Sequence, residues 1–184
     1  MRVIAGAARR TPLTAPRGMN TRPTSDRAKE SLFNIIGSRI IGKQFLELFA
    51  GSGAIGIEAL SRGAAKAVFV DNASEAVESI KSNLSKAKLG NAEICKLDAE
   101  DAIEAFACEG RRFDFVFLDP PYESQLLEQT LQHLADADIL AAGGFIVAET
   151  NAGFSPVLPQ PLILEDTRTY GRTRFMFLSK GADG

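Results

Sequence analysis

The sequence FLELFAGSGAIG at Phe45–Gly56 predicts a strand, a tight turn and the start of a helix. Gly51, Gly53 and Gly56 form a GxGxxG pattern directly after an apolar run. Glycines in such a turn allow a sharp reversal and a close approach of a ligand to the backbone, and the following helix presents unpaired amide groups. NAD, FAD and S-adenosylmethionine all fit this pattern, and a turn with a purely structural role is the alternative.

Beyond this turn, short apolar runs alternate with amphipathic stretches. The apolar runs have the length and composition of strands that are covered on both faces. We expect strands at Gln44–Ala50, Ala67–Asp71, Glu93–Leu97, Phe113–Asp119 and Gly144–Glu149, and helices at Ala54–Arg62, Ser74–Lys88, Ala99–Ala107 and Ser124–Ala137. Asn72, Asp98 and Ser124 stand where helix caps are expected. The repeated strand-then-helix order predicts a doubly wound α/β fold.

The C-terminal part of the chain departs from this alternation. Leu162–Thr169 and Arg172–Ser179 predict two strands joined across Tyr170 and Gly171 in a hairpin. A parallel sheet closed by such a hairpin resembles the sheet of Rossmann-like class I methyltransferases, whose last strand runs antiparallel to the others. We therefore expect a mostly parallel seven-stranded sheet with an antiparallel last strand.

Acidic residues stand at the ends of the predicted strands near the glycine turn. Glu47 lies four residues before Gly51, where its carboxylate could pair with the ammonium group of a methionine but would repel a pyrophosphate. Asp71 ends the second strand and could accept from both ribose hydroxyls. Asp98, together with the Ala99 amide, could bind an adenine amino group or simply cap a helix. The charge of Glu47 therefore favours S-adenosylmethionine over a dinucleotide.

The fourth strand ends in FDFVFLDPPY, Phe113–Tyr122. The carboxyl ends of parallel strands form the ligand-binding rim of open α/β sheets, so Asp119 is expected at that rim. Prolines have no amide hydrogen, so Asp119 and the Pro120 carbonyl can both accept hydrogens from one amino group. Tyr122 offers a flat face for a stacked base, worth roughly 1–3 kcal/mol. The stretch predicts methyl transfer to an exocyclic amine, whose lone pair is freed when both its hydrogens are held.

Charge is distributed unevenly along the chain. The 184 residues carry a net charge of −2, but residues 1–43 contain nine basic and two acidic residues, a net charge of +7. A chain polarised in this way suits a polyanionic partner bound by one end, and a solvated basic arm is the alternative. We expect a basic N-terminal extension at residues 1–43 and a catalytic domain at residues 44–184.

The remaining composition narrows the class of protein. No apolar run reaches the roughly 18 residues of a membrane helix, so we expect a soluble cytoplasmic protein. Cys95 and Cys108 lack the spacing of a zinc site or a disulfide framework and are expected to be buried thiols, with no metal bound. His133 falls in a helical pattern and is expected to be a surface or packing residue.

Three sequence blocks, in chain order, resemble the RsmD family of small-subunit ribosomal RNA (guanine-N2)-methyltransferases. They are RPTSDRAKESLFN at Arg22–Asn34, LELFAGSGAIGIEALSRG at Leu46–Gly63 and LDPPY at Leu118–Tyr122. Many amino-methyltransferases share the second and third blocks, whereas the first is far more specific to the family. The resemblance covers essentially the full chain. It implies S-adenosylmethionine as the cofactor and ribosomal RNA as the partner. We expect this RNA to be bound within an assembling small subunit, with naked RNA as the alternative, and we expect a monomer.

The resemblance also implies a role for individual residues. The cofactor would be held by Thr24, Glu47, Gly51, Gly53, Asp71, Asp98 and Ala99. The target guanine would be held by Asp119, Pro120 and Tyr122. In this family the basic N-terminal extension faces RNA, so Arg9, Arg10, Arg17 and Arg22 would contact phosphates, with Tyr170 near the target base.

Three other functions fit parts of the sequence. The DPPY stretch alone does not distinguish guanine N2 from adenine N6 or cytosine N4, so an amino-methyltransferase acting on DNA or another RNA is the main alternative. A nicotinamide-dependent oxidoreductase would use the GxGxxG turn with Asp71. A non-catalytic RNA-binding protein with the same fold is the third possibility.

Overall fold

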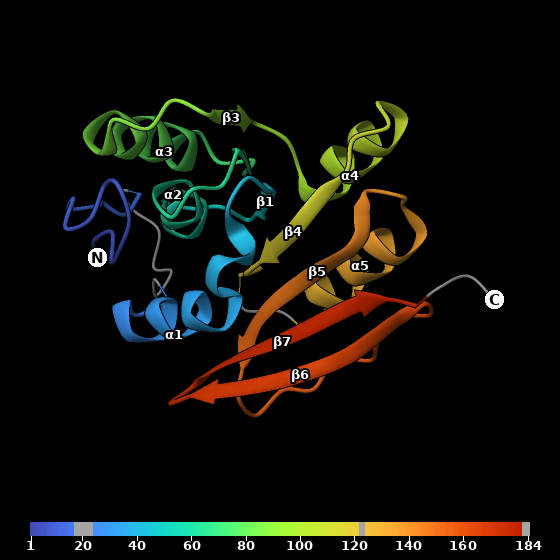
Figure 1. The fold of residues 1–184 in the computed structure, drawn as a ribbon. Coiled ribbons are helices and arrows are strands. Elements are labelled where there is room, and N and C mark those ends of the chain that lie inside the picture. The colour runs from blue at the N-terminus through green and yellow to red at the C-terminus, as the bar shows by residue number, and fades with distance from the viewer. Residues whose placement is uncertain (17–23, 122–123, 182–184) are drawn as a thin grey trace.

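The protein folds as a seven-stranded sheet with helices on both faces, seen in a computed structural model that describes residues 1–16, 24–121 and 124–181 (Figure 1). The helices are α1 (Asp26–Ile36), a 3₁₀ turn (Gly37–Ile40), α2 (Ala54–Ser61), α3 (Ser74–Ala87), α4 (Ala99–Cys108) and α5 (Ser124–Asp136). The strands are β1 (Gln44–Leu48), β2 (Lys66–Val70), β3 (Ala92–Cys95), β4 (Phe113–Leu118), β5 (Leu140–Asn151), β6 (Leu162–Tyr170) and β7 (Thr173–Lys180).

The strand order in the sheet is β3-β2-β1-β4-β5-β7-β6. Strands β1 to β5 pair in parallel, and β7 runs antiparallel to both β5 and β6. The predicted fold class and the terminal hairpin are therefore confirmed. After β3 the chain crosses back over β1 to form β4, so the strand order reverses between β1 and β4. Such a reversal opens a crevice at the carboxyl ends of the strands, where ligands bind in open α/β sheets.

Two hydrophobic cores lie on the two faces of the sheet. Side chains alternate between the faces along each strand, so Phe45 and Glu47 share one face while Leu46 and Leu48 share the other. The first face is covered by α1, α2 and α3, and the second by α4 and α5 (Figure 1). Phe33, Phe69 and Phe115 are all buried on the first face.

Residues 24–43 contribute to the first core through a helix that the sequence analysis did not predict. Leu32, Phe33 and Ile36 on α1 are buried in this core. The helix begins after Ser25, whose side chain accepts a hydrogen bond from the amide of Ala28 at 3.1 Å. The RPTSDR block therefore leads into a packed helix.

A buried ion pair fastens the N-terminal loop to α1 and α2. Lys29 and Glu58 are fully buried, with 3.5 Å between Nζ and Oε2. Lys29 also donates to the carbonyl oxygen of Arg2 at 2.7 Å. The Glu58 carboxylate accepts from the amides of Ile4 at 2.7 Å and Ala5 at 3.0 Å. These contacts fix the course of the first residues, which continue towards the crevice.

Some local predictions were confirmed and others were wrong. Asp98 occupies the N-cap position of α4 as expected, although its side chain makes no capping hydrogen bond, whereas the N-cap position of α3 is Ala73 instead of Asn72. Cys108 is exposed and Cys95 only half-buried, since one ends a surface helix and the other a strand at the edge of the sheet. His133 lies on the surface beside Glu100, as expected. No helix within the described residues is long and apolar enough to cross a membrane.

Candidate active site

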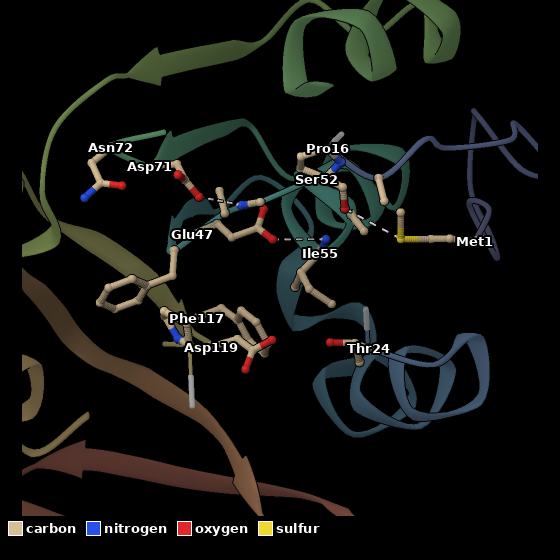
Figure 2. A pocket seen from close by; sticks show the side chains of 16 residues that line it. Met1, Pro16, Thr24, Glu47, Ser52, Ile55, Asp71, Asn72, Phe117 and Asp119 are labelled. Atoms are coloured by element: carbon tan, nitrogen blue, oxygen red, sulfur yellow. Dashed lines mark hydrogen bonds between the residues drawn. The ribbon is translucent and has the colours of Figure 1, made fainter. Parts of the chain in front are cut away.

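A pocket of about 140 Å³ lies at the carboxyl ends of β1, β2 and β4, where the strand order reverses. Its lining includes Thr24, Glu47, Gly51, Asp71 and Asp119, five residues that the sequence analysis assigned to a site. Figure 2 shows the side chains of Thr24, Glu47, Asp71 and Asp119 around one opening, with Met1 and Pro16 of the N-terminal segment on another side of it. The parallel sheet thus brings together Glu47, Asp71 and Asp119, which are up to 72 positions apart in the sequence.

Glu47 lies beneath the first turn of α2. Its carboxylate accepts from the amides of Ile55 at 3.3 Å and Gly56 at 2.8 Å. Burial raises the pKa of Glu47 to about 8, although the two amide hydrogen bonds oppose this shift. The free protein therefore holds Glu47 largely protonated at neutral pH, and a cationic ligand beside it would favour the ionised form.

Gly56 leaves the space that Glu47 occupies. A Cβ added to Gly56 would lie 2.5 Å from the Phe69 ring and 2.8 Å from Glu47 Oε2, closer than packed atoms approach. We expect Gly56→Ala to lower the free energy of unfolding by about 1–3 kcal/mol, because α2 must shift away from the sheet. Urea denaturation measures this change. Gly90→Ala is the matched control, since a Cβ there meets no atom within 4 Å; equal stability of the two variants would contradict this packing argument.

Asp71 joins the glycine turn to the end of β2. Its carboxylate accepts from the amide of Gly51 at 2.8 Å and from the amide of Ala73 at 3.0 Å. Each carboxylate oxygen has a second lone pair, so Asp71 can still accept from a ligand hydroxyl. The residue therefore shapes the turn and faces the pocket at once (Figure 2).

Asp119 follows β4 on the same face as Glu47. Phe117, two residues earlier, is paired with Glu47 across the β1–β4 ladder, and both line the pocket with Asp119. Burial raises the pKa of Asp119 well above its usual range, and the nearby carboxylates of Glu149 and Glu47 raise it further. Asp119 is thus a half-buried acceptor at the pocket mouth, with prolines after it.

Glu149, near the carboxyl end of β5, was not singled out in the sequence. It is buried, and its Oε2 accepts from the hydroxyl of Thr24 at 2.5 Å. The sequence did indicate a role for Glu149, because this residue ends the predicted fifth strand just as Asp71 and Asp119 end theirs. An acid in that position was a candidate for the same rim of the sheet.

The other predicted residues lie around the pocket or away from it. Gly53 and Pro120 flank lining residues, whereas Asp98 and Ala99 are not part of the lining. Asp98 instead accepts from the side chain of Asn72 at 2.7 Å, and Asn72 does line the pocket. Three residues to which the sequence analysis gave roles, Arg17, Arg22 and Tyr122, fall outside the described residues.

Arg9, Arg10 and Tyr170 lie outside the pocket. Both arginines are exposed on the N-terminal loop, and Tyr170 ends β6 with its ring 6.1 Å from that of Phe175. The N-terminal segment also supplies pocket residues that the sequence analysis missed. Met1 and Pro16 line the wall, and Met1 Sδ lies 3.6 Å from the hydroxyl of Ser52 in the glycine turn.

The lining of the pocket favours a cationic ligand. Three carboxyl groups face it, from Glu47, Asp71 and Asp119, a cation beside them favours their ionised forms, and none of its described lining residues is a lysine or arginine. A pyrophosphate would meet repulsion here, whereas an ammonium or sulfonium group would be attracted. The residues therefore fit S-adenosylmethionine, which carries both groups, better than NAD or FAD.

Comparison with known proteins places the chain in a family. The model of the family described as "Conserved hypothetical protein 95" matches residues 1–179. The chain is 43% identical over 175 residues to "Putative rRNA methyltransferase YlbH" of Bacillus subtilis, covering 94% of this chain and 95% of that protein. It is 34% identical over 185 residues to "Ribosomal RNA small subunit methyltransferase D" of Escherichia coli strain K12, covering 100% of this chain and 92% of that protein. The chain belongs to the RsmD family.

Its fold is also that of a solved structure with a related sequence. "Putative methyltransferase yhhF" from Escherichia coli superposes with a TM-score of 0.85 at 30% sequence identity, over 100% of this chain and 99% of that chain. The RsmD family resemblance seen in the three sequence blocks is therefore confirmed. The likeness extends through the N-terminal loop and α1, and both pack against the sheet and the pocket in this chain.

Proposed function

We propose that this protein transfers a methyl group from S-adenosylmethionine to the exocyclic N2 amine of a guanine in small-subunit ribosomal RNA. The observation that carries the proposal is Asp119, a carboxylate followed by two prolines at the mouth of an acid-lined pocket. The Escherichia coli relative named as a small-subunit ribosomal RNA methyltransferase supports the choice of RNA.

Glu47, Gly51 and Asp71 would hold S-adenosylmethionine, which supplies an electrophilic methyl group on a sulfonium. Glu47 would pair with the ammonium of the methionine part, and Asp71 would accept from the ribose. Asn72 lines the pocket and Asp98 does not. The adenosine part of S-adenosylmethionine would therefore contact Asn72 instead of Asp98. Thr24 would close the pocket over the methionine end.

Asp119 and the Pro120 carbonyl would hold the two hydrogens of the guanine amine. This turns the nitrogen lone pair out of the ring plane and towards the methyl group. The nitrogen would form the new bond to the methyl carbon as the carbon–sulfur bond breaks and S-adenosylhomocysteine leaves, and the methylated amine would then release one proton to water. Tyr122 would stack on the base.

The N-terminal residues would bind the RNA backbone. Arg9 and Arg10 are exposed on a loop that also provides pocket residues, so a phosphate contact there would place RNA near the pocket. Arg17 and Arg22, in the same basic segment, would extend this contact, and Tyr170 would approach the target base.

Methyl transfer to under-methylated small subunits tests this function. We expect label from S-adenosylmethionine in the small-subunit RNA, with much less in large-subunit RNA or duplex DNA. Naked RNA and assembled subunits are compared in parallel to identify the physical substrate. Label in duplex DNA alone would overturn the RNA proposal, and heat of binding with NAD but none with S-adenosylmethionine would overturn the cofactor.

Binding of S-adenosylmethionine should release a proton near neutral pH. Glu47 has a pKa of about 8 in the free protein, so it is mostly protonated at pH 6.5 and must ionise to pair with the ammonium group. Affinity should therefore rise between pH 6 and pH 7.5, by up to about tenfold per pH unit. Calorimetry in two buffers of different ionisation enthalpy measures the released proton. Glu47→Gln should abolish the release, and an unchanged release in this variant would place the titrating group elsewhere.

A further inference from the structure

Glu149 stands beside Asp119 in the sheet. In the parallel ladder between β4 and β5, Phe117 pairs with Val147 and Leu118 pairs with Ala148. Continuing this register pairs Asp119 with Glu149. Neighbouring strands lie about 4.8 Å apart, and paired positions direct their side chains to the same face. The two carboxylates therefore begin from adjacent backbone positions on the face that carries the pocket.

Two hydroxyl groups fix the position of the Glu149 carboxylate. Thr24 donates to Oε2 at 2.5 Å, and Thr173 at the start of β7 donates to Oε1 at 3.4 Å. Glu149 is only 8% exposed, yet its partner Thr24 and its neighbour Asp119 both line the pocket. Burial raises the pKa of Glu149, while the two hydroxyls favour its ionised form.

The carboxylate keeps free acceptor capacity at this place. Each oxygen has two lone pairs, and each receives one hydroxyl hydrogen bond in the structure. Thr24 and Thr173 come from distant parts of the chain, so the carboxylate is held from two sides. A side chain held in this way suits the recognition of one partner in a fixed geometry.

We propose that Glu149 accepts a hydrogen bond from N1–H of the target guanine while Asp119 holds the neighbouring N2 amine. The inference rests on the proposed function and adds what the DPPY stretch does not provide, the choice of base. Glu149 would be the specificity-determining residue, with Thr24 and Thr173 holding it in place.

Base chemistry explains why a carboxylate here selects guanine. The Watson–Crick edge of guanine presents two adjacent donors, N1–H and the N2 amine. Adenine and cytosine place a ring-nitrogen lone pair next to their amine, and that lone pair would face the carboxylate without a hydrogen between them. Leaving such groups unpaired in a site built for a hydrogen bond is strongly unfavourable. The Asp119 and Glu149 pair would therefore accept guanine and reject the other two amines.

Exchanging the target base tests the inference. The substrate RNA carries either guanine or 2,6-diaminopurine at the methylated position; the latter keeps the N2 amine but has a lone pair at N1. Wild-type protein should prefer guanine, measured as the ratio of the two kcat/KM values. Glu149→Gln should lower this preference by about 10- to 100-fold, because an amide can either accept or donate at N1. Comparing ratios cancels any effect of the base on RNA folding, since both proteins meet the same two RNAs.

Controls separate base reading from damage to the fold. Glu165→Gln makes the same chemical change on the exposed strand β6 and should keep the wild-type ratio. Thermal melting and the affinity for S-adenosylmethionine show whether Glu149→Gln remains folded with an intact pocket. Where turnover of the variant is too slow, the ratio of the dissociation constants of the two RNAs, measured with S-adenosylhomocysteine present, replaces the kinetic ratio.

The possible outcomes distinguish a failure of the role of Glu149 from a failure of the proposed function. A ratio for Glu149→Gln within about twofold of the wild-type value, including an equal loss on both bases, overturns the role of Glu149. Failure of the wild-type protein to methylate the guanine RNA contradicts the proposed function itself. Selective gain on the diaminopurine RNA by Glu149→Gln supports both.

Discussion

Asp119→Ala is expected to lower kcat by about 10²- to 10³-fold, as the loss of one preorganised polar group in an active site commonly does. The proposed role of Asp119 is to hold one hydrogen of the amine, and Pro121, the other described lining residue that follows β4, has no side-chain acceptor to replace it. Affinity for S-adenosylmethionine should change little, because Glu47 and Asp71 would hold the cofactor. Single-turnover kinetics and calorimetry measure the two effects separately.

The pH profile adds a second readout for Asp119. Only the ionised carboxylate offers both oxygens as acceptors, so activity should fall as the pH drops through a pKa that burial and Glu149 hold above its usual range. Asp138→Ala is the matched control, an exposed aspartate next to the amino end of β5, opposite the pocket. Equal kcat values for Asp119→Ala and wild type would exclude the acceptor role.

Glu58→Ala is expected to destabilise the fold by about 3–5 kcal/mol, since it leaves the buried Lys29 without its partner. The amides of Ile4 and Ala5 also lose their acceptor. At about 2–4 °C per kcal/mol for a chain of this size, the melting temperature should fall by roughly 10 °C. Differential scanning calorimetry measures the fall, and Glu75→Ala, at an exposed position on α3, serves as the control.

A double variant tests whether the unpaired charge causes this loss. Lys29→Met with Glu58→Leu removes both charges and should recover part of the stability, because apolar side chains can replace a buried ion pair. The free energy of unfolding lost in the double variant should be smaller than the sum of the losses in Lys29→Met and Glu58→Leu. A loss equal to that sum would contradict this explanation. The single variant should also weaken cofactor binding, since Met1 and Pro16 of the loosened segment line the pocket.

The parallel strands were predictable because strands covered on both faces have continuous apolar sequences. The hairpin was predictable for a different reason, because Tyr170 and Gly171 mark a turn between two segments with strand-like composition. Helix α1 was missed because its charged residues suggested a solvated arm, although Leu32, Phe33 and Ile36 have helical spacing. Full burial of Lys29 could not be foreseen, since it depends on Glu58 nearly thirty positions away.

Some residues of the candidate site could be predicted from the sequence and others could not. Glu47, Asp71 and Asp119 were found because each stands near the end of a strand, and the parallel sheet brings such ends together. Glu149 carried the same signal and was overlooked. Asn72 lines the pocket and Asp98 does not, and this could not be predicted because it depends on which way two neighbouring loops turn.

Identification of the methylated nucleoside decides whether guanine N2 is the methyl acceptor. Small-subunit RNA labelled by the wild-type protein is digested to nucleosides, and the labelled product is identified by chromatography and mass spectrometry. We expect a single labelled species, N2-methylguanosine, whose initial rate of formation falls by about 10²- to 10³-fold when Asp119→Ala replaces the wild type at equal concentration. Label in N6-methyladenosine or N4-methylcytidine would contradict the assignment of guanine N2 and, with it, the role of Glu149.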